Sequence, residues 1–571
     1  MGHLNFIHSE TGRTENYLGI PAEPLQLRDH NRSSTRKNGC RRSRMNYFLT
    51  LIVALFTLVG FAQNTAPQIQ ITDVTADETA KTLTVNYSLN DAESNICEVW
   101  LKMSLDDGIY FETIPQANIT GDIGTGINPN PTLSLTWDYS DLTVGIRSVD
   151  IKLFASDNQA VDIAEMVSQV DETKLLSNLQ FIEGERHYLT TPVHLEEVRT
   201  FIEDAFWDAN LQTERHSFLH YHTMMQNIIG RQPGVKDEAT TYIIDGHFDG
   251  VAGSPAADDN GSAVAGTLEA LRILSQYSFE HSIRFIGFDA EESIWPNGSN
   301  RYIYNGIKPF EDLQGTLNME MIGFYSYEIN SQTVPAGFGT LFPEAVQEMA
   351  DDDFRGNFLF GVGNTNSNPL LTAFIDASEN YVPELRLITV SVSGTGQIAP
   401  DLRRSDHAMF WDAGLQALML TDTANFRNPN YHTPGDNIGT LDFEFMKNVV
   451  KAVLATAAEL AVPISAGFDE ADLSTWLSIG EHDQPFVADI FIFPNPSNGL
   501  LSLRVENAKT GFTSRVEIYD LVGKRVYQDV LEFSAGTSNS EIDLQNLANG
   551  SYILRFKSGN VTKSLSFIIA D

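Results

Sequence analysis

The chain has 571 residues, of which 42% are hydrophobic and 10% aromatic, so it is too long for one core and too apolar for a disordered chain. Its formal net charge of −38 offers no basic face for phosphate groups and argues against a nucleic-acid partner. We expect two to four domains with an acidic, well-solvated surface.

Sixteen uncharged residues, "YFLTLIVALFTLVGFA", run from Tyr47 to Ala62 and follow three arginines at 41, 42 and 44. The run is short for a membrane-spanning helix and predicts a secretory signal peptide that is cleaved after Ala62. We interpret the residues before Met45 as a mis-called start, so residues 1–62 would be missing from the mature protein. Cys97 is then the only cysteine, which excludes an internal disulfide.

Residues 65–157 alternate apolar and polar positions in short runs such as "KTLTVNYSL" and "SVDIKLFAS", separated by turn residues. This pattern predicts an antiparallel β-sandwich of the immunoglobulin-like or fibronectin-like kind. A structural spacer is the simpler role for it, and docking of carbohydrate or substrate is the alternative.

Between residues 171 and 463 the pattern changes to helices at 194–206 and 261–277 that alternate with compact strands. The strands read "TYIID", "SIRFIGFD", "GTLNMEMIGF" and "QALMLTD". Alternation of strand and helix predicts an α/β domain with a mostly parallel sheet covered by helices on both faces. Ligands of such domains bind at the carboxyl ends of the strands.

A stretch rich in Ser, Asp and Gly at 464–486 is interpreted as a linker. Short strands return at 487–571, for example "LSLRVEN" and "SYILRFKSG", and predict a second, smaller β-sandwich.

Charged side chains follow the strands of the α/β domain. His247 and Asp249 follow the first strand, Glu291 and Glu292 the next, and Asp258 and Asp259 directly precede a helix. Each motif alone is weak, but together they give five potential ligands at strand ends or in the loops after them: His247, Asp258, Glu292, Glu320 and His432. Two imidazoles and three carboxylates suit a pair of zinc ions bridged by one carboxylate.

These motifs resemble peptidase family M28, the zinc metallopeptidases that include secreted bacterial aminopeptidases. The matching segments are "GHFDG", "AADDNGSAVAGTLEALR", "IRFIGFDAEES", "NMEMIGF", "SDHAMFWDAGLQALMLTD" and "NYHTPGDN", in family order over roughly 290 residues. The resemblance implies a zinc-peptidase fold and hydrolysis of N-terminal peptide bonds in peptide or protein substrates.

Carried over by position, the resemblance implies that Asp258 bridges two zinc ions. His247 and Glu320 would complete one site, and Glu292 and His432 the other. The family commonly has Asp where this chain has Glu320, so a changed geometry and weaker occupancy are expected there. The donor set is also compatible with cobalt or manganese.

The resemblance further implies that Glu291 is the general base and that Asp249 orients His247 through its far ring nitrogen. Because neighbouring strand residues point in opposite directions, one glutamate can bind metal while the other faces the metal-bound water. The family often has a cis peptide between the residues at 258 and 259.

Two other functions remain open at this point. A glutaminyl cyclase on the same scaffold works with one zinc ion, and the full set of five ligands disfavours it. A surface adhesin with a degenerate peptidase domain is the non-enzymatic alternative, and the retained Glu291 disfavours it.

The C-terminal segment, with "PNPSNG", a "GK" turn and "NGSYILRF", resembles the type IX secretion sorting domain. The resemblance implies export through the periplasm to the cell surface or medium by the type IX machinery. A carbohydrate-binding or adhesive sandwich is the alternative, and the oligomeric state stays open.

Overall fold

The computed structural model describes residues 64–570 except 78, 106–107, 143–148, 221, 294–296, 473–488, 509–511, 521–524, 535 and 559–560. The predicted signal peptide and mis-called start, residues 1–62, lie outside the described residues. Among the described helices, none is long and apolar enough to cross a membrane.

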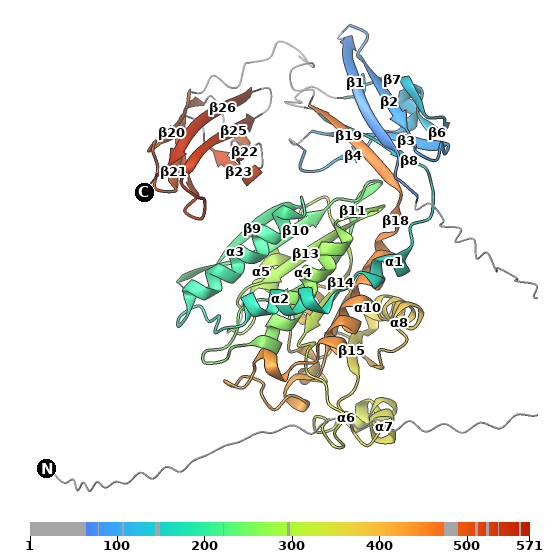
Figure 1. Ribbon diagram of the computed structural model, residues 1–571, viewed down its shortest axis with the longest axis vertical. Helices are drawn as coiled ribbons and strands as arrows, with labels where there is room; N and C mark the ends of the chain where they lie inside the picture. Colours follow the sequence, from blue (N-terminus) through green and yellow to red (C-terminus); the bar gives the residue numbers. More distant parts are fainter. Residues whose placement is uncertain are drawn as a thin grey trace, which may run out of the picture. The chain divides into compact units, whose positions relative to one another are not determined.

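The central domain is built on an eight-stranded sheet (Figure 1). In spatial order its strands are β16 (Leu387–Val392), β15 (Leu359–Asn364), β17 (Ala417–Thr421), β14 (Asp312–Glu320), β11 (Asp237–His247), β13 (His281–Phe288), β10 (Thr223–Gln232) and β9 (Gln212–His220). Four of the seven neighbouring pairs are parallel, and the β15–β17, β13–β10 and β10–β9 pairs are antiparallel. The predicted α/β class is confirmed, and the sheet is mixed.

Helices cover both faces of this sheet and enclose a separate apolar core on each. One face carries α1 (Ile163–Ser168), α2 (Glu172–Ile182), α3 (Pro192–Asp208), α4 (Ala263–Leu274), α8 (Asn368–Tyr381) and α10 (Phe443–Ala461). The other face carries α5 (Gly298–Asn305), α6 (Phe338–Leu341), α7 (Pro343–Asp351) and α9 (His407–Asp412). Because α1 contributes to the first core, the domain begins before the predicted residue 171.

Local sequence explains where these helices start. The carboxylate of Asp442 accepts a hydrogen bond from the Phe445 amide and caps α10, and α3 begins with a proline.

A glycine lets helix α4 approach the sheet closely. At the end of β11, a Cβ on Gly246 would lie 2.7 Å from Cβ of Ala263. The glycine therefore lets the first turn of α4 approach the strand that ends in His247.

The segment before the central domain folds into two sheets around one core. One sheet contains β1 (Gln68–Asp77), β2 (Thr82–Asn90), β7 (Asn130–Asp138) and β5 (Ile119–Gly121). The other contains β19 (Ala466–Asp472), β8 (Asp150–Ser156), β3 (Cys97–Ser104) and β4 (Glu112–Thr113), with β6 (Gly124–Ile127) beside β3. Cys97 is buried and unpaired within this core.

Strand β19 corrects the predicted linker. The linker was expected at 464–486, yet residues 466–472 pair with β8 along their whole length, and residues 463–464 form β18, which pairs with β12 (Ser278–Phe279). The Gly- and Asp-rich composition of "AGFDEAD" concealed a strand whose partner lies about three hundred residues earlier in the chain.

The C-terminal segment also forms two sheets that share one apolar core. The first contains β20 (Asp489–Phe493), β21 (Leu500–Ala508) and β24 (Gly536–Asp543). The second contains β23 (Arg525–Phe533), β22 (Phe512–Asp520), β25 (Gly550–Ser558) and β26 (Val561–Ile569).

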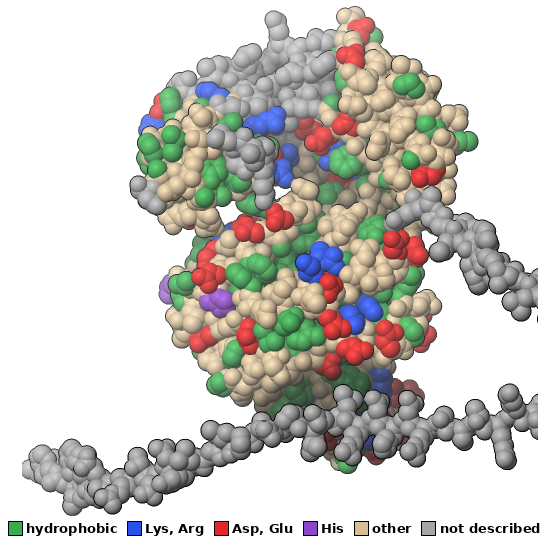
Figure 2. Space-filling model, in the orientation of Figure 1, with side chains coloured by type: hydrophobic (Ala, Val, Ile, Leu, Met, Phe, Trp, Pro, Cys, Tyr) green, Lys and Arg blue, Asp and Glu red, His purple; other side chains and the backbone are tan. Residues whose placement is uncertain are grey.

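The strong negative charge is spread over the surface. On the face seen in Figure 2, acidic side chains are scattered across the middle of the molecule among fewer basic ones. A dispersed negative charge of this kind favours solubility and repels phosphate groups.

Stability between pH 6.5 and 4 is expected to depend on His407. The imidazole ring of His407 is fully buried, and its Nε2 lies 3.0 Å from the carbonyl oxygen of Leu402. Burial lowers the pKa of His407 from 6.5 to about 4. In the unfolded chain His407 is protonated below about pH 6.5, whereas in the folded chain it stays neutral down to about pH 4. The free energy of unfolding therefore falls as the pH is lowered through this range. The loss is on the order of 3 kcal/mol. Urea unfolding of the metal-free protein should show a flatter pH dependence in His407→Gln, and equal slopes in both proteins would contradict this.

Candidate active site

The side chains singled out by sequence gather at the carboxyl edge of the sheet. β11 ends at His247 and β14 ends at Glu320. Glu291 and Glu292 lie in the turn after β13, where Ala290 has a positive φ of 62°, and not on the strand as expected. His432 lies in the loop after β17.

Asp259 is the carboxylate that lies between the two histidines. Its Oδ1 is 3.6 Å from Nε2 of His247, and its Oδ2 is 3.0 Å from Nε2 of His432. His247, Asp259 and Glu320 form one group of potential ligand atoms within 4.8 Å of one another, and Asp259, Glu292 and His432 form a second. One carboxylate thus belongs to both groups.

Asp258, the expected bridge, is turned away from these groups. Its Oδ1 accepts a hydrogen bond from the Gly323 amide at 2.9 Å, and its Oδ2 accepts one from Nδ2 of Asn428 at 2.7 Å. Both oxygens are therefore engaged in holding two other loops. The expected cis peptide is also displaced by one residue, to Asp259–Asn260.

His247 is held by one ring nitrogen and free at the other. Nδ1 lies 3.2 Å from the backbone oxygen of Asp249 and 3.4 Å from its Oδ1. Nε2 is buried and makes no hydrogen bond, although Oε2 of Glu320 lies at 3.4 Å and Oε2 of Glu291 at 3.9 Å. A buried nitrogen ringed by carboxylate oxygens at these distances is suited to a cation between them.

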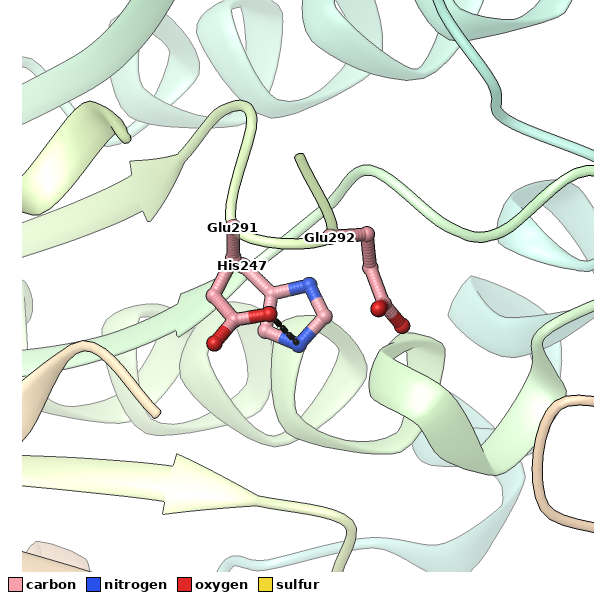
Figure 3. A group of neighbouring side chains, drawn as sticks. All are labelled: His247, Glu291 and Glu292. Atoms are coloured by element: carbon pink, nitrogen blue, oxygen red, sulfur yellow. Dashed lines mark ion pairs between the residues drawn. The ribbon is translucent and has the colours of Figure 1, made fainter. Parts of the chain in front are cut away.

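Asp249 does more than contact His247. Its Oδ1 accepts a hydrogen bond from the amide of Glu291, and its Oδ2 accepts one from the amide of Glu292, both at 3.0 Å. The carboxylate therefore fixes the turn that carries both glutamates. As Figure 3 shows, these glutamates descend from one loop toward the ring of His247, and the three groups lie within 4.8 Å of one another.

Glu320 is anchored by two residues that the sequence did not single out. Its Oε2 accepts a hydrogen bond from Oγ of Ser405 at 2.8 Å and one from Nδ2 of Asn260 at 3.3 Å. Both donors lie on segments far from β14 in the sequence, so only the fold reveals them.

Burial and charge together set the protonation of the metal-free site. Burial raises the pKa values of Glu291 and Glu292 well above their ordinary value. Burial alone would lower the pKa of His247, but the charge of Glu320 and close contacts with the carboxylates of Asp249 and Glu320 raise it well above its usual range. Burial would raise the pKa of Asp259, yet its contact with His432 and the charge of both histidines lower it. Such a cluster of acids relies on cations for its stability.

An apolar cavity adjoins Glu320. Its lining includes Val334, Phe338, Met349, Phe360, Leu402, Met419 and Phe426, with Arg404 and Tyr431 also lining it. The Tyr431 ring stacks on His432 at 3.7 Å between centroids, and its hydroxyl accepts a hydrogen bond from Arg404 at 2.8 Å. Sequence reasoning did not find this cavity, because its walls come from strands, helices and loops spread between residues 320 and 431.

Parts of this chain are similar in sequence to known proteins. Residues 227–457 match the model of peptidase family M28, and residues 491–570 match the secretion system C-terminal sorting domain. YfbL of Escherichia coli is 29% identical over 37% of this chain and 64% of its own length. Leucine aminopeptidase 1 of Sclerotinia sclerotiorum is 27% identical over 56% of this chain and 79% of its own.

The crystal structure of BSAP, a zinc aminopeptidase from Bacillus subtilis, is 24% identical, covers 42% of this chain and 51% of its own, and superposes with a TM-score of 0.32. The chain thus spans less than two thirds of YfbL and about half of BSAP. Over residues 227–457 this chain is thus similar to peptidase family M28, and over residues 491–570 it is similar to the secretion system C-terminal sorting domain.

Proposed function

We propose that this chain is a secreted aminopeptidase that binds two zinc ions and removes N-terminal residues with large apolar side chains. The observation that carries the proposal is the position of Asp259, whose two oxygens face His247 and His432 separately. A carboxylate shared in this way is the bridge that a two-metal hydrolase needs.

The donor set fits zinc. His247 and Glu320 with one oxygen of Asp259 would hold the first ion, and Glu292 and His432 with the other oxygen would hold the second. Bound zinc supplies a Lewis acid for the scissile carbonyl and lowers the pKa of water toward neutrality. The orphaned Nε2 of buried His247 supports this assignment, because nothing else satisfies that nitrogen.

Glu291 is the proposed general base. Its carboxylate lies beside the first group of ligands, and Asp249 holds its backbone, so it is placed to take a proton from the attacking water. Burial raises its pKa, which suits a group that must accept the proton at one oxygen and release it to the leaving amine. Asp249 positions Glu291, Glu292 and His247 together.

The apolar cavity beside Glu320 is the proposed pocket for the side chain of the N-terminal residue. Its walls of Phe, Met, Leu and Val suit leucine or a larger apolar side chain. The hydroxyl of Tyr431 and the guanidinium of Arg404 line the same cavity and can donate hydrogen bonds to a substrate carbonyl. The leucine aminopeptidase of Sclerotinia supports this preference by its name.

The sorting domain directs the protein to secretion or to the cell surface. We propose that it passes through the periplasm and is recognised there by the type IX machinery.

The bridging role of Asp259 is tested by two neighbouring substitutions. Asp259→Asn should lose chelator-resistant zinc and nearly all peptidase activity, because the shared ligand is neutralised. Asp258→Asn serves as the matched control, since this residue is equally buried but bonded to Gly323 and Asn428, and it should retain two zinc ions per chain. Metal analysis of the two purified variants shows which residue holds zinc. Zinc loss confined to Asp258→Asn would show that Asp258 is the bridging ligand, as the sequence predicted.

The role of Glu291 is tested by Glu291→Gln. The variant should keep its zinc and lose about 10²- to 10⁴-fold in kcat on leucyl peptides, since only proton transfer is removed. Steady-state kinetics with metal analysis of the same sample checks this. Turnover close to that of the wild type would rule out Glu291 as the base.

The pocket is tested by filling it. Val334→Phe should lower kcat/KM for leucyl substrates about 10- to 200-fold relative to alanyl substrates, because the larger side chain no longer fits. Leu341→Phe, at an exposed position of α6 outside the cavity lining, should leave the leucyl-to-alanyl ratio unchanged. An unchanged ratio in Val334→Phe would place the side-chain pocket elsewhere.

A further inference from the structure

A short segment ahead of the family-matched region contacts three loops of the site. Residues 183–188 lie in the connection between α2 and α3, which runs from 183 to 191, whereas the family match starts at residue 227. Oε1 of Glu183 accepts a hydrogen bond from the amide of Ile438, in the loop after His432. Tyr188 packs against the small apolar cluster of Phe218, Met225 and Ala290, and Ala290 precedes the proposed general base.

Arg186 makes the third and most extensive contact. Its side chain is fully buried, and its guanidinium donates hydrogen bonds to carbonyl groups only. The acceptors are Phe248 at 2.7 Å from Nε, Ala256 at 2.7 Å from Nη2, and Ile182, Gly184 and Pro255 at 2.8, 2.9 and 3.1 Å from Nη1. Backbone bonds from Gly250 to Arg186 and from Gly184 to Pro255 join the same two segments.

Three of these carbonyl groups, those of Phe248, Pro255 and Ala256, belong to the loop that separates two proposed metal ligands. Residues 248–258 connect His247 with Asp259, so the course of this loop sets where the second ligand lies relative to the first. Buried carbonyl groups need donors, and a guanidinium provides several donors in one rigid plane. A lysine offers three donors around one point and cannot span acceptors at both ends of the loop.

We propose that Arg186 is a positioning residue that holds loop 248–256 in the shape that brings Asp259 to His247, and so sets the zinc affinity of the site. Its effect on zinc affinity rests on the proposed zinc site, and its effect on turnover rests on the proposed peptidase activity as well. The positive charge of Arg186 weakens zinc binding, whereas its hydrogen bonds to the loop strengthen it. A guanidinium near Asp249, Asp259 and Glu292 repels a divalent cation, so removing the charge alone would tighten zinc binding.

The experiment compares zinc affinity in variants of the full chain by competition with a chelator, with zinc alone as the probe. Arg186→Lys keeps the positive charge but loses the planar set of guanidinium donors, and this variant should bind zinc about 10- to 100-fold more weakly than the wild type. Arg186→Met loses both and should still bind zinc more weakly than the wild type, although the loss of the charge alone would tighten binding. Arg284→Lys is the matched control, because Arg284 is also buried but donates to Tyr302 and Glu311, away from the site, and its zinc affinity should not change.

Amide hydrogen exchange gives a second readout. Residues 248–256 should exchange faster in Arg186→Lys than in the wild type or in Arg284→Lys. Zinc affinity within twofold of the wild type in Arg186→Lys would overturn the proposal, as would tighter binding in Arg186→Met. If the methionine variant does not fold, the lysine variant decides. A wild type that binds zinc but cleaves no peptide would sink the aminopeptidase assignment and leave the positioning role standing.

Discussion

The site depends on a concentration of buried negative charge that the protein alone does not neutralise. Asp249, Asp259, Glu291, Glu292 and Glu320 gather around only two imidazoles, those of His247 and His432. Desolvating so many carboxylates is strongly unfavourable unless cations accompany them. Two divalent ions, as proposed, would bring four positive charges to five acids and nearly balance the cluster. In the metal-free site, burial raises the pKa values of Glu291 and Glu292 well above their ordinary value.

Sheet topology brings these groups together. β11, β13, β14 and β17 are neighbours and parallel, so their carboxyl ends open on the same edge. Each strand end, or the loop after it, then contributes one or two side chains to the site. The outer antiparallel strands β9 and β10 supply no ligand. The β9–β10 hairpin instead packs Phe218 and Met225 against Ala290 and supports the turn that carries the glutamates.

The sequence predicts the features of the fold and the site that depend on local patterns, and it does not predict those that depend on partners far away along the chain. The α/β class, the main helices and the gathering of histidines and acids at strand ends follow from periodicity and from the resemblance. The choice between Asp258 and Asp259 does not, because two adjacent acids look alike in a sequence. It is decided by partners from distant segments, since the Gly323 amide and Asn428 hold Asp258. Strand β19 and the apolar cavity were missed for the same reason: their partners are far away along the chain.

Glu320 shows how a departure from the family pattern is accommodated. A glutamate reaches one methylene further than the aspartate expected there and has an additional rotatable bond, so on its own it would hold a metal less precisely. In this structure Oε2 is fixed by Ser405 and Asn260, and it lies 3.4 Å from Nε2 of His247. Asn260 also donates to the Met319 carbonyl next to Glu320. The longer side chain is therefore held by the residue that follows Asp259, which couples its position to that of the proposed bridging carboxylate and supports the proposed metal site.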